Sequence, residues 1–180
     1  TSYGIGGKVL AYIKPFDKYE LIKIIKLIKK NNSKFYFVGS GSNLLVNDKK
    51  INAYIITPSK TLKLLNIDNN IITAESGVML GKIVKESIKN NLTGLEGLVG
   101  VPGTLGGALM MNAGAWGAEI SNYLLSVDII LNNGEIKTLY PNDIEFNYRN
   151  SSLSSNEFIL SAKFKLNKAN RANINKRKQI

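Results

Sequence analysis

Gly100-Val101-Pro102-Gly103-Thr104-Leu105-Gly106-Gly107-Ala108, continued by Asn112-Ala113-Gly114-Ala115-Trp116-Gly117, is the stretch that decides the fold. Because an ordered glycine is destabilising by roughly 0.5–1 kcal/mol relative to alanine, so many glycines indicate a main chain that something flat and polar approaches closely. Pro102 stiffens the entry, and Gly106-Gly107 allows a helix to begin close to a phosphate, with its N–H groups aimed at it. The alternative is a glycine-rich connection that packs two lobes together.

A second glycine segment, Gly39-Ser40-Gly41-Ser42-Asn43, follows the apolar run Phe35 to Val38. Glycines remove the Cβ atoms that would hold an anion away from the backbone, and successive N–H groups form an anion-binding nest. The segment is not the dinucleotide-binding fingerprint, because the third glycine and the following helix of that motif are missing. It predicts an anion-binding loop, with a tight strand–loop–strand turn as the alternative.

The third segment is Phe146-Asn147-Tyr148-Arg149-Asn150-Ser151-Ser152. Arg149 offers a fixed cation and a planar fork of donors, which suits a carboxylate or a developing oxyanion. The alternative is a surface ion-pair partner, the commoner role of an arginine beside a tyrosine.

Hydrophobic periodicity predicts two amphipathic helices. The first begins at Asp17, with Glu20 completing a capping box, and ends near Asn31-Asn32. The second follows Glu75 and carries apolar residues on one face and charged residues on the other: Leu80, Ile83, Val84 and Ile88 against Lys82, Lys85, Glu86 and Lys89.

Short apolar or alternating runs predict strands between these helices. Two hairpins are expected, one around Asp68-Asn69-Asn70 and one around Asn132-Asn133-Gly134, a strong turn signal. The expected strands are Phe35–Val38, Leu44–Val46, Tyr54–Ile56, Leu62–Ile67, Ile71–Glu75, Val127–Leu131, Glu135–Leu139 and Phe158–Leu166.

Composition excludes several kinds of chemistry. The 180 residues include no cysteine and no histidine, so thiolate chemistry, a Ser-His-Asp triad and flavins linked through Cys or His are excluded. No metal site is expected, and the absence of cysteine fits a cytoplasmic protein. No apolar run approaches the roughly 18 to 20 residues of a membrane span, so membrane insertion is not expected.

The net charge of +11 leaves a nucleic-acid partner to be considered. The lysines are spread over helix faces and the C-terminal tail, without interleaved exposed aromatic residues. We therefore expect solvated surfaces with a general attraction for anions rather than a nucleic-acid site.

In this order and spacing, the segments resemble the UDP-N-acetylenolpyruvoylglucosamine reductase family, also called UDP-N-acetylmuramate dehydrogenase. Trp116 stands where an aromatic residue, usually Tyr, is common. The matching stretches are the start at Thr1-Ser2-Tyr3 and Ile5-Gly6-Gly7, the pyrophosphate loop at 39–46, the flavin cradle at 100–108 and 112–119, and the Tyr-Arg-x-Ser motif at 148–151.

The resemblance implies an α+β, two-lobed FAD-binding fold of the vanillyl-alcohol oxidase or p-cresol methylhydroxylase type. Residues 1–58 are expected to form an N-terminal α/β lobe, and residues 59–167 a second lobe with an antiparallel sheet. Residues 168–180 are expected to begin a substrate-binding domain whose remainder is missing from this chain and which packs against the flavin face.

The resemblance also assigns residues to the site. Arg149 is expected to be catalytic, steadying the enolate or the substrate carboxylate, and Tyr148 to shape the substrate pocket with it. Non-covalent FAD is expected to be held by Gly39, Ser40, Gly41, Ser42, Asn43, Leu44, Gly97, Val101, Pro102, Gly103, Thr104, Gly106, Gly107, Asn112, Gly114 and Ala115.

The implied activity belongs to peptidoglycan precursor synthesis in the cytoplasm. NADPH reduces the flavin, and hydride then passes to the enolpyruvyl ether of a UDP-sugar, UDP-N-acetylglucosamine enolpyruvate, giving UDP-N-acetylmuramate. The family's proton-donating Ser and assisting Glu have no match after Leu166. We therefore expect FAD binding with little or no reductase turnover from this chain.

Two other functions remain open. One is the FAD-binding domain of a different oxidoreductase of the same superfamily, against which the Tyr-Arg-x-Ser match argues. The other is a non-catalytic module that binds anions or nucleic acid through its positive charge, which predicts colourless protein and steeply salt-dependent binding.

Overall fold

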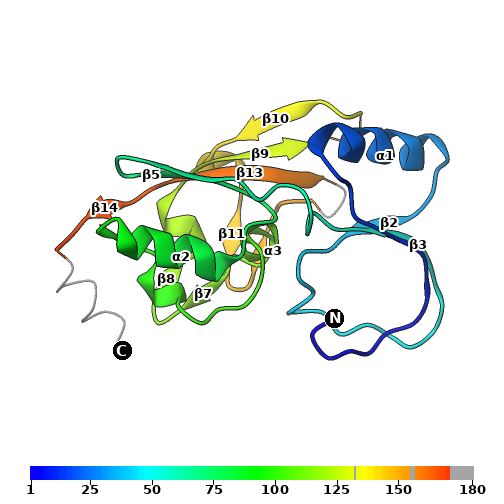
Figure 1. Cartoon of the computed structure of the whole chain (residues 1–180), viewed down its shortest axis with the longest axis horizontal. Helices are drawn as coiled ribbons and strands as arrows, with labels where there is room; N and C mark the ends of the chain where they lie inside the picture. The colour runs from blue at the N-terminus through cyan, green and yellow to red at the C-terminus, as the bar shows by residue number, and fades with distance from the viewer. Residues whose placement is uncertain (132, 155–156, 171–180) are drawn as a thin grey trace.

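Two sheets of different kind organise the computed structural model (Figure 1), which describes residues 1–131, 133–154 and 157–170. The first sheet is small and parallel, with strand order β1-β3-β2. Its strands are β1 (Val9–Ile13), β2 (Phe35–Phe37) and β3 (Ile51–Ile56).

Helix α1 (Lys18–Lys30) connects β1 to β2 and begins where the sequence predicts. The Asp17 side chain accepts a hydrogen bond from the Glu20 N–H at 2.7 Å. Glu20 in turn accepts from the Phe16 N–H at 2.5 Å, one residue earlier than an ideal capping box. Because Leu21, Ile25 and Ile28 face inward, the helix buries one stripe and leaves its lysines outside.

The second sheet has five antiparallel strands in the order β10-β9-β13-β5-β4. The two predicted hairpins, β4–β5 and β9–β10, are confirmed, although Asn132 lies outside the described residues. Helix α2 (Leu80–Lys89) is also confirmed, and lies beside this sheet in Figure 1. The strands are β4 (Leu65–Asp68), β5 (Ile71–Glu75), β9 (Leu124–Ile130), β10 (Ile136–Leu139) and β13 (Phe158–Lys165).

Short elements carry the glycine-rich and arginine-bearing segments. Helix α3 (Leu105–Met110) is followed by the hairpin β7 (Gly114–Ala115) and β8 (Ala118–Glu119). A further hairpin pairs β11 (Phe146–Asn147) with β12 (Asn150–Ser151). The remaining short elements are β6 (Leu92–Thr93), which pairs with β14 (Asn167–Lys168), and the 3-10 turns η1 (Glu96–Leu98), η2 (Ile120–Tyr123) and η3 (Pro141–Asp143).

Two hydrophobic clusters hold the elements together. The larger one lies between the five-stranded sheet, α2 and α3, around the fully buried Phe164. The smaller one joins the inward face of α1 to Phe35 and Ile56 of the parallel sheet, and to Ile130 and Phe158 of the five-stranded sheet. The two sheets therefore share part of their core.

Two strand predictions differ from the structure. The expected strand Leu44–Val46 is wrong, because the chain is irregular there and Leu45 is 80% exposed. Strand β1 was not predicted, although Val9–Ile13 is an apolar run. The hairpin expected from Leu62 begins only at Leu65, since Leu62 has a φ of 52°, which takes it out of the strand conformation.

Residues 171–180, which include most of the segment predicted to begin a further domain, lie outside the described residues. None of the helices within the described part of the chain combines the length and apolarity of a bilayer crossing.

Candidate functional site

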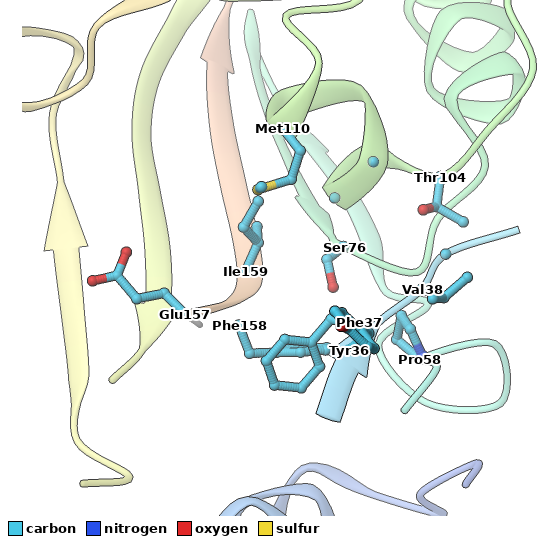
Figure 2. Close-up of a pocket in the computed structure, with 13 residues that line it drawn as sticks. Tyr36, Phe37, Val38, Pro58, Ser76, Thr104, Met110, Glu157, Phe158 and Ile159 are labelled. Atoms are coloured by element: carbon cyan, nitrogen blue, oxygen red, sulfur yellow. The ribbon is translucent and has the colours of Figure 1, made fainter. Parts of the chain in front are cut away.

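A pocket, here named the loop pocket, opens where β2 of the parallel sheet approaches α3 and β13 (Figure 2). Its free interior is about 120 Å³, less than the roughly 300–1,000 Å³ of a whole small-molecule site, so it can enclose only part of such a ligand. Its lining consists of Tyr36, Phe37, Val38, Gly39, Pro58, Ser76, Thr104, Gly106, Gly107, Met110, Glu157, Phe158 and Ile159.

The two glycine segments of the sequence meet beside this pocket. A Cβ on Gly39 would lie 2.2 Å from Thr104 Oγ1, so only glycine allows the first segment to pass Thr104 at this distance. On the same side, a Cβ on Gly103 would lie 3.3 Å from Ser42 Oγ, and Gly103 has a φ of 129°. Segments more than 60 residues apart in sequence are thus brought into contact.

The start of α3 is used differently from the sequence prediction. The Leu105 N–H donates to the Val78 carbonyl at 2.8 Å, and the Gly106 N–H donates to the Ser76 carbonyl at 3.0 Å. A Cβ on Gly106 would lie 3.1 Å from Ser76 Cβ. Gly106 therefore allows close packing, and its N–H forms a hydrogen bond inside the protein. Gly107 remains exposed on the pocket wall.

The loop pocket is lined by apolar side chains, hydroxyls and bare backbone. Glu157 is the one charged residue among its lining residues, and none of them is Lys or Arg. An anion in this pocket would therefore be held by hydrogen-bond donors rather than by ion pairs.

A second pocket, the hairpin pocket, lies between the β7–β8 and β11–β12 hairpins. Both hairpin turns contain a non-glycine residue in the left-handed region, Trp116 at φ 53° and Arg149 at φ 57°. Such residues are uncommon, and here both lie in tight hairpin turns, whose geometry requires a positive φ. The lining residues are Asn112, Gly114, Ala115, Trp116, Gly117, Ala118, Glu119, Asn122, Tyr148 and Arg149.

Asn112, directly after α3, joins the two hairpins. Its Nδ2 donates to Glu119 Oε2 at 2.9 Å and to the Asn147 carbonyl at 3.2 Å, two residues before Arg149. Asn112 is buried with a φ of 40°, and its Oδ1 has no hydrogen-bond partner within the described residues. The amide therefore fixes the hairpin that carries Arg149 and leaves one acceptor unused.

Tyr148 and Arg149 form the exposed tip of that hairpin. Tyr148 is 85% exposed, and the Arg149 guanidinium carbon lies 5.7 Å from its ring centroid, a cation–π distance. Among the described residues, no carboxylate forms an ion pair with Arg149. The cation is thus available to an anionic ligand from outside.

The expected site residues divide between these places. The loop pocket brings together Gly39, Thr104, Gly106 and Gly107, and the hairpin pocket brings together Asn112, Gly114, Ala115, Tyr148 and Arg149. Gly97 lies beneath the β7–β8 hairpin, where a Cβ would approach Ala118 Cβ to 2.9 Å. The others line neither pocket: Ser40, Gly41, Ser42, Asn43, Leu44, Val101, Pro102 and Gly103.

Sequence reasoning did not single out Ser76 or Glu119. Glu119 lies inside the glycine-rich motif, and its position seven residues after Asn112 was the available signal. Ser76 stands between Glu75 and Gly77, where serine is an ordinary turn residue, so no sequence signal marks it.

Among the residues that the structure describes, no group of three or more potential metal ligands lies together. The lining of both pockets instead suits an elongated organic ligand with an anionic part. Glycine backbone and hydroxyls lie at the beginning of α3, and amide and guanidinium groups lie at its other end. Six residues of helix separate them by roughly 9 Å.

The family model described as "FAD binding domain" matches residues 9–140 of this chain. Among curated proteins, UDP-N-acetylenolpyruvoylglucosamine reductase of Clostridium kluyveri is 43% identical over 97% of this chain and 57% of its own length. The reductase of Streptococcus mutans is 40% identical over 90% of this chain and 53% of its own. The chain thus spans about half the length of these curated relatives.

The comparison with solved structures leads to the same fold as the sequence comparisons. UDP-N-acetylenolpyruvylglucosamine reductase of Thermus caldophilus superposes with a TM-score of 0.80 at 27% identity, covering 99% of this chain and 63% of that one. A cholesterol oxidase of Brevibacterium sterolicum gives 0.67 at 16% identity, over 87% of this chain and 34% of that one, which shows a shared fold. The predicted two-lobed FAD-binding fold of the vanillyl-alcohol oxidase type is confirmed.

Proposed function

The chain belongs to the FAD binding domain family, and we propose that it supplies the flavin-binding part of a UDP-N-acetylenolpyruvoylglucosamine reductase. The main support for this proposal is the pair of pockets next to α3, the loop pocket along the helix and the hairpin pocket just after it. One is built from backbone and hydroxyls, and the other presents a cation without an ion-pair partner among the described residues.

In this proposal the loop pocket takes the diphosphate of FAD. Gly39 and Gly107 expose backbone there, and Thr104 adds a hydroxyl. The neighbouring loop from Ser40 to Leu44 and the stretch from Val101 to Gly103 border the same ligand. Because no lysine or arginine among the described residues lines the pocket, oriented N–H and O–H groups carry the recognition.

The hairpin pocket takes the flavin ring and the reacting end of the substrate. Gly114 and Ala115 offer backbone close to a flat ring, with Gly97 packed beneath their hairpin. The Asn112 Oδ1, which is buried and without a partner among the described residues, is an acceptor suited to a ring N–H. The hairpin pocket therefore fits the flavin ring in two respects: it offers an acceptor for a ring N–H, and backbone against which a flat ring can lie.

When bound, FAD supplies hydride chemistry: it accepts hydride from NADPH and passes it to the enolpyruvyl double bond of the UDP-sugar. Arg149 binds the substrate carboxylate and stabilises the negative charge that develops when hydride arrives. Tyr148 borders the same end of the pocket. Asn112 holds the backbone of their hairpin through the Asn147 carbonyl.

The presence of two sheets supports a division of the chain into two lobes. We propose residues 1–58 as one FAD-binding lobe and residues 59–167 as the other, with residues 168–180 leading into a substrate-binding domain that meets the flavin face. We also propose that the activity, whose product is UDP-N-acetylmuramate, serves peptidoglycan precursor synthesis in the cytoplasm.

The test begins with FAD. The purified chain should be yellow or become so on titration with FAD, and denaturation should release the flavin because no covalent link is expected. UDP-N-acetylglucosamine enolpyruvate should then change the flavin absorption spectrum, whereas UDP-N-acetylglucosamine without the enolpyruvyl group should change it less. A colourless protein that does not take up FAD would contradict the proposal.

A further inference from the structure

We propose that the Ser76 hydroxyl is a ligand for the FAD diphosphate, a role that the glycine loops alone do not provide. The inference rests on the proposed function, because it takes FAD as the occupant of the loop pocket. Ser76 directly follows β5 in the chain, and in space it lies next to the beginning of α3, on the pocket wall.

The backbone of Ser76 is fixed from two sides. Its N–H donates to the Leu160 carbonyl of β13 at 2.8 Å, and its carbonyl accepts from the Gly106 N–H at 3.0 Å. Gly106 also packs directly against its Cβ. The side chain is therefore held in place, and Figure 2 shows its oxygen directed into the loop pocket.

The hydroxyl has no partner in the protein. Ser76 is 2% exposed, and its Oγ makes no hydrogen bond within the described residues. A buried hydroxyl without a partner is unfavourable, and most such groups in proteins are satisfied. A serine held so firmly, with its hydroxyl unsatisfied, is explained if a ligand atom accepts a hydrogen bond from that hydroxyl.

The surroundings favour a phosphate oxygen as that acceptor. Gly39, Thr104 and Gly107 line the same pocket, so the group opposite Ser76 meets donors and bare backbone. With no Lys or Arg in the lining as far as residues 1–131, 133–154 and 157–170 show, every neutral donor contributes more to anion binding. A hydroxyl bonded to an ionised oxygen forms a short, charge-assisted hydrogen bond, stronger than one to a neutral acceptor.

Ser87 is a matched contrast in the same protein. It is also fully buried, but its Oγ donates to the Val84 carbonyl at 2.8 Å, one turn earlier in α2, and it lines neither the loop pocket nor the hairpin pocket. Ser87 therefore satisfies its hydroxyl inside the protein, whereas Ser76 does not.

The test compares Ser76→Ala with Ser87→Ala in the full 180-residue chain. Dissociation constants are measured for FAD, for ADP, which keeps a diphosphate, and for riboflavin, which has no phosphate. Ser76→Ala should weaken FAD about 10- to 100-fold, the range for a hydrogen bond to a charged group, and should also weaken ADP. Riboflavin should be unaffected, and Ser76→Cys, a weaker donor of similar shape, should be intermediate.

Thermal unfolding without flavin separates this role from a structural one. Removing an unsatisfied hydroxyl should leave the melting temperature of Ser76→Ala unchanged or raised, whereas Ser87→Ala should lower it. Unchanged FAD affinity in a folded Ser76→Ala variant would overturn the inference, as would a loss shared with riboflavin but not with ADP. Failure of the wild-type chain to bind FAD would instead refute the proposed function.

Discussion

The loop pocket, which runs along α3, and the hairpin pocket, which begins just after this helix, are built on opposite principles. The loop pocket is formed by segments from both sheets, has apolar walls and has no cationic side chain among its described lining residues. The hairpin pocket is formed by two tight turns with left-handed Trp116 and Arg149, and its cation is exposed at a tip. Holding a cofactor requires a preorganised enclosure, whereas meeting a substrate requires reactive groups that remain accessible.

The largest effect is expected from filling the contact between the glycine segments. In Gly39→Val the new side chain would overlap Thr104, where even a Cβ would lie 2.2 Å from Oγ1. Overpacking of this kind is destabilising by about 1–3 kcal/mol. Because Gly39 and Thr104 both line the loop pocket, the strain should displace its wall, and FAD affinity should fall about 10- to 100-fold. Fluorescence titration with FAD measures it.

Gly81→Ala is the control for that variant. Gly81 lies in α2, and a Cβ there would meet nothing within 4 Å. The alanine should raise the free energy of unfolding by roughly 0.5–1 kcal/mol and leave FAD affinity unchanged. Equal FAD affinity in both variants would show that the loop pocket is not the cofactor site.

The second-largest effect is expected at Asn112, whose side chain links the two hairpins that form the hairpin pocket. Asn112→Asp replaces the Nδ2 donor with an oxygen facing Glu119 Oε2 and the Asn147 carbonyl, 2.9 and 3.2 Å from the present nitrogen. Losing both bonds in a buried place should lower the free energy of unfolding by about 2–3 kcal/mol. Urea denaturation at neutral pH measures it.

Asn122→Asp is the matched control, since Asn122 also lines the hairpin pocket and lies outside the Asn112 hydrogen bonds. It should shift stability by less than about 0.5 kcal/mol. If Asn112→Asp were equally mild, Asn112 would not fix the Arg149 hairpin.

A smaller effect of opposite sign is expected at Arg149. Replacing a left-handed residue with glycine relieves backbone strain, so Arg149→Gly should raise the free energy of unfolding by about 0.5–1 kcal/mol. Arg149→Ala keeps the strain at φ 57° and should not be stabilising.

Both Arg149 variants should bind FAD as the wild type does and lose the spectral response to UDP-N-acetylglucosamine enolpyruvate. That pattern is the reverse of the one expected for Gly39→Val. Loss of FAD binding in both Arg149 variants would contradict the proposal that Arg149 binds the substrate rather than the cofactor.

The smallest effect is expected from salt. Because no Lys or Arg of the part of the chain that the structure describes lines the loop pocket, raising NaCl from about 50 to 500 mM should change the FAD dissociation constant by less than about threefold. Substrate binding near the exposed Arg149 should weaken more. A steep loss of FAD affinity with salt would favour the anion-binding module that the net charge of +11 suggests.

Sequence reasoning identified the elements whose signals are local. Asp17 caps α1, Gly134 turns the β9–β10 hairpin with a φ of 86°, and α2 shows a full apolar stripe. The strand predicted at Leu44–Val46 was wrong because an apolar run alone does not distinguish a strand from a loop. Exposed Leu45 shows the difference only in three dimensions.

The sequence singled out the glycine segments, and the structure brings them together beside the loop pocket, but it did not predict the individual contacts. The Gly106 N–H donates to the Ser76 carbonyl rather than to an outside anion. This exchange depends on where β5 ends relative to α3, a tertiary fact without a local signature. For the same reason Ser76, with its unused hydroxyl, could not be read from the sequence.

The cluster shared by α1, β9 and β13 has a kinetic consequence. Because Ile25 and Ile28 pack with Ile130 and Phe158, the parallel sheet cannot swing away from the five-stranded sheet without breaking a common core. Release of a bound cofactor by a hinge motion between the sheets would therefore require local unfolding of this cluster. If FAD leaves by that route, its lifetime on the protein should track the stability of the cluster rather than the strength of any single hydrogen bond.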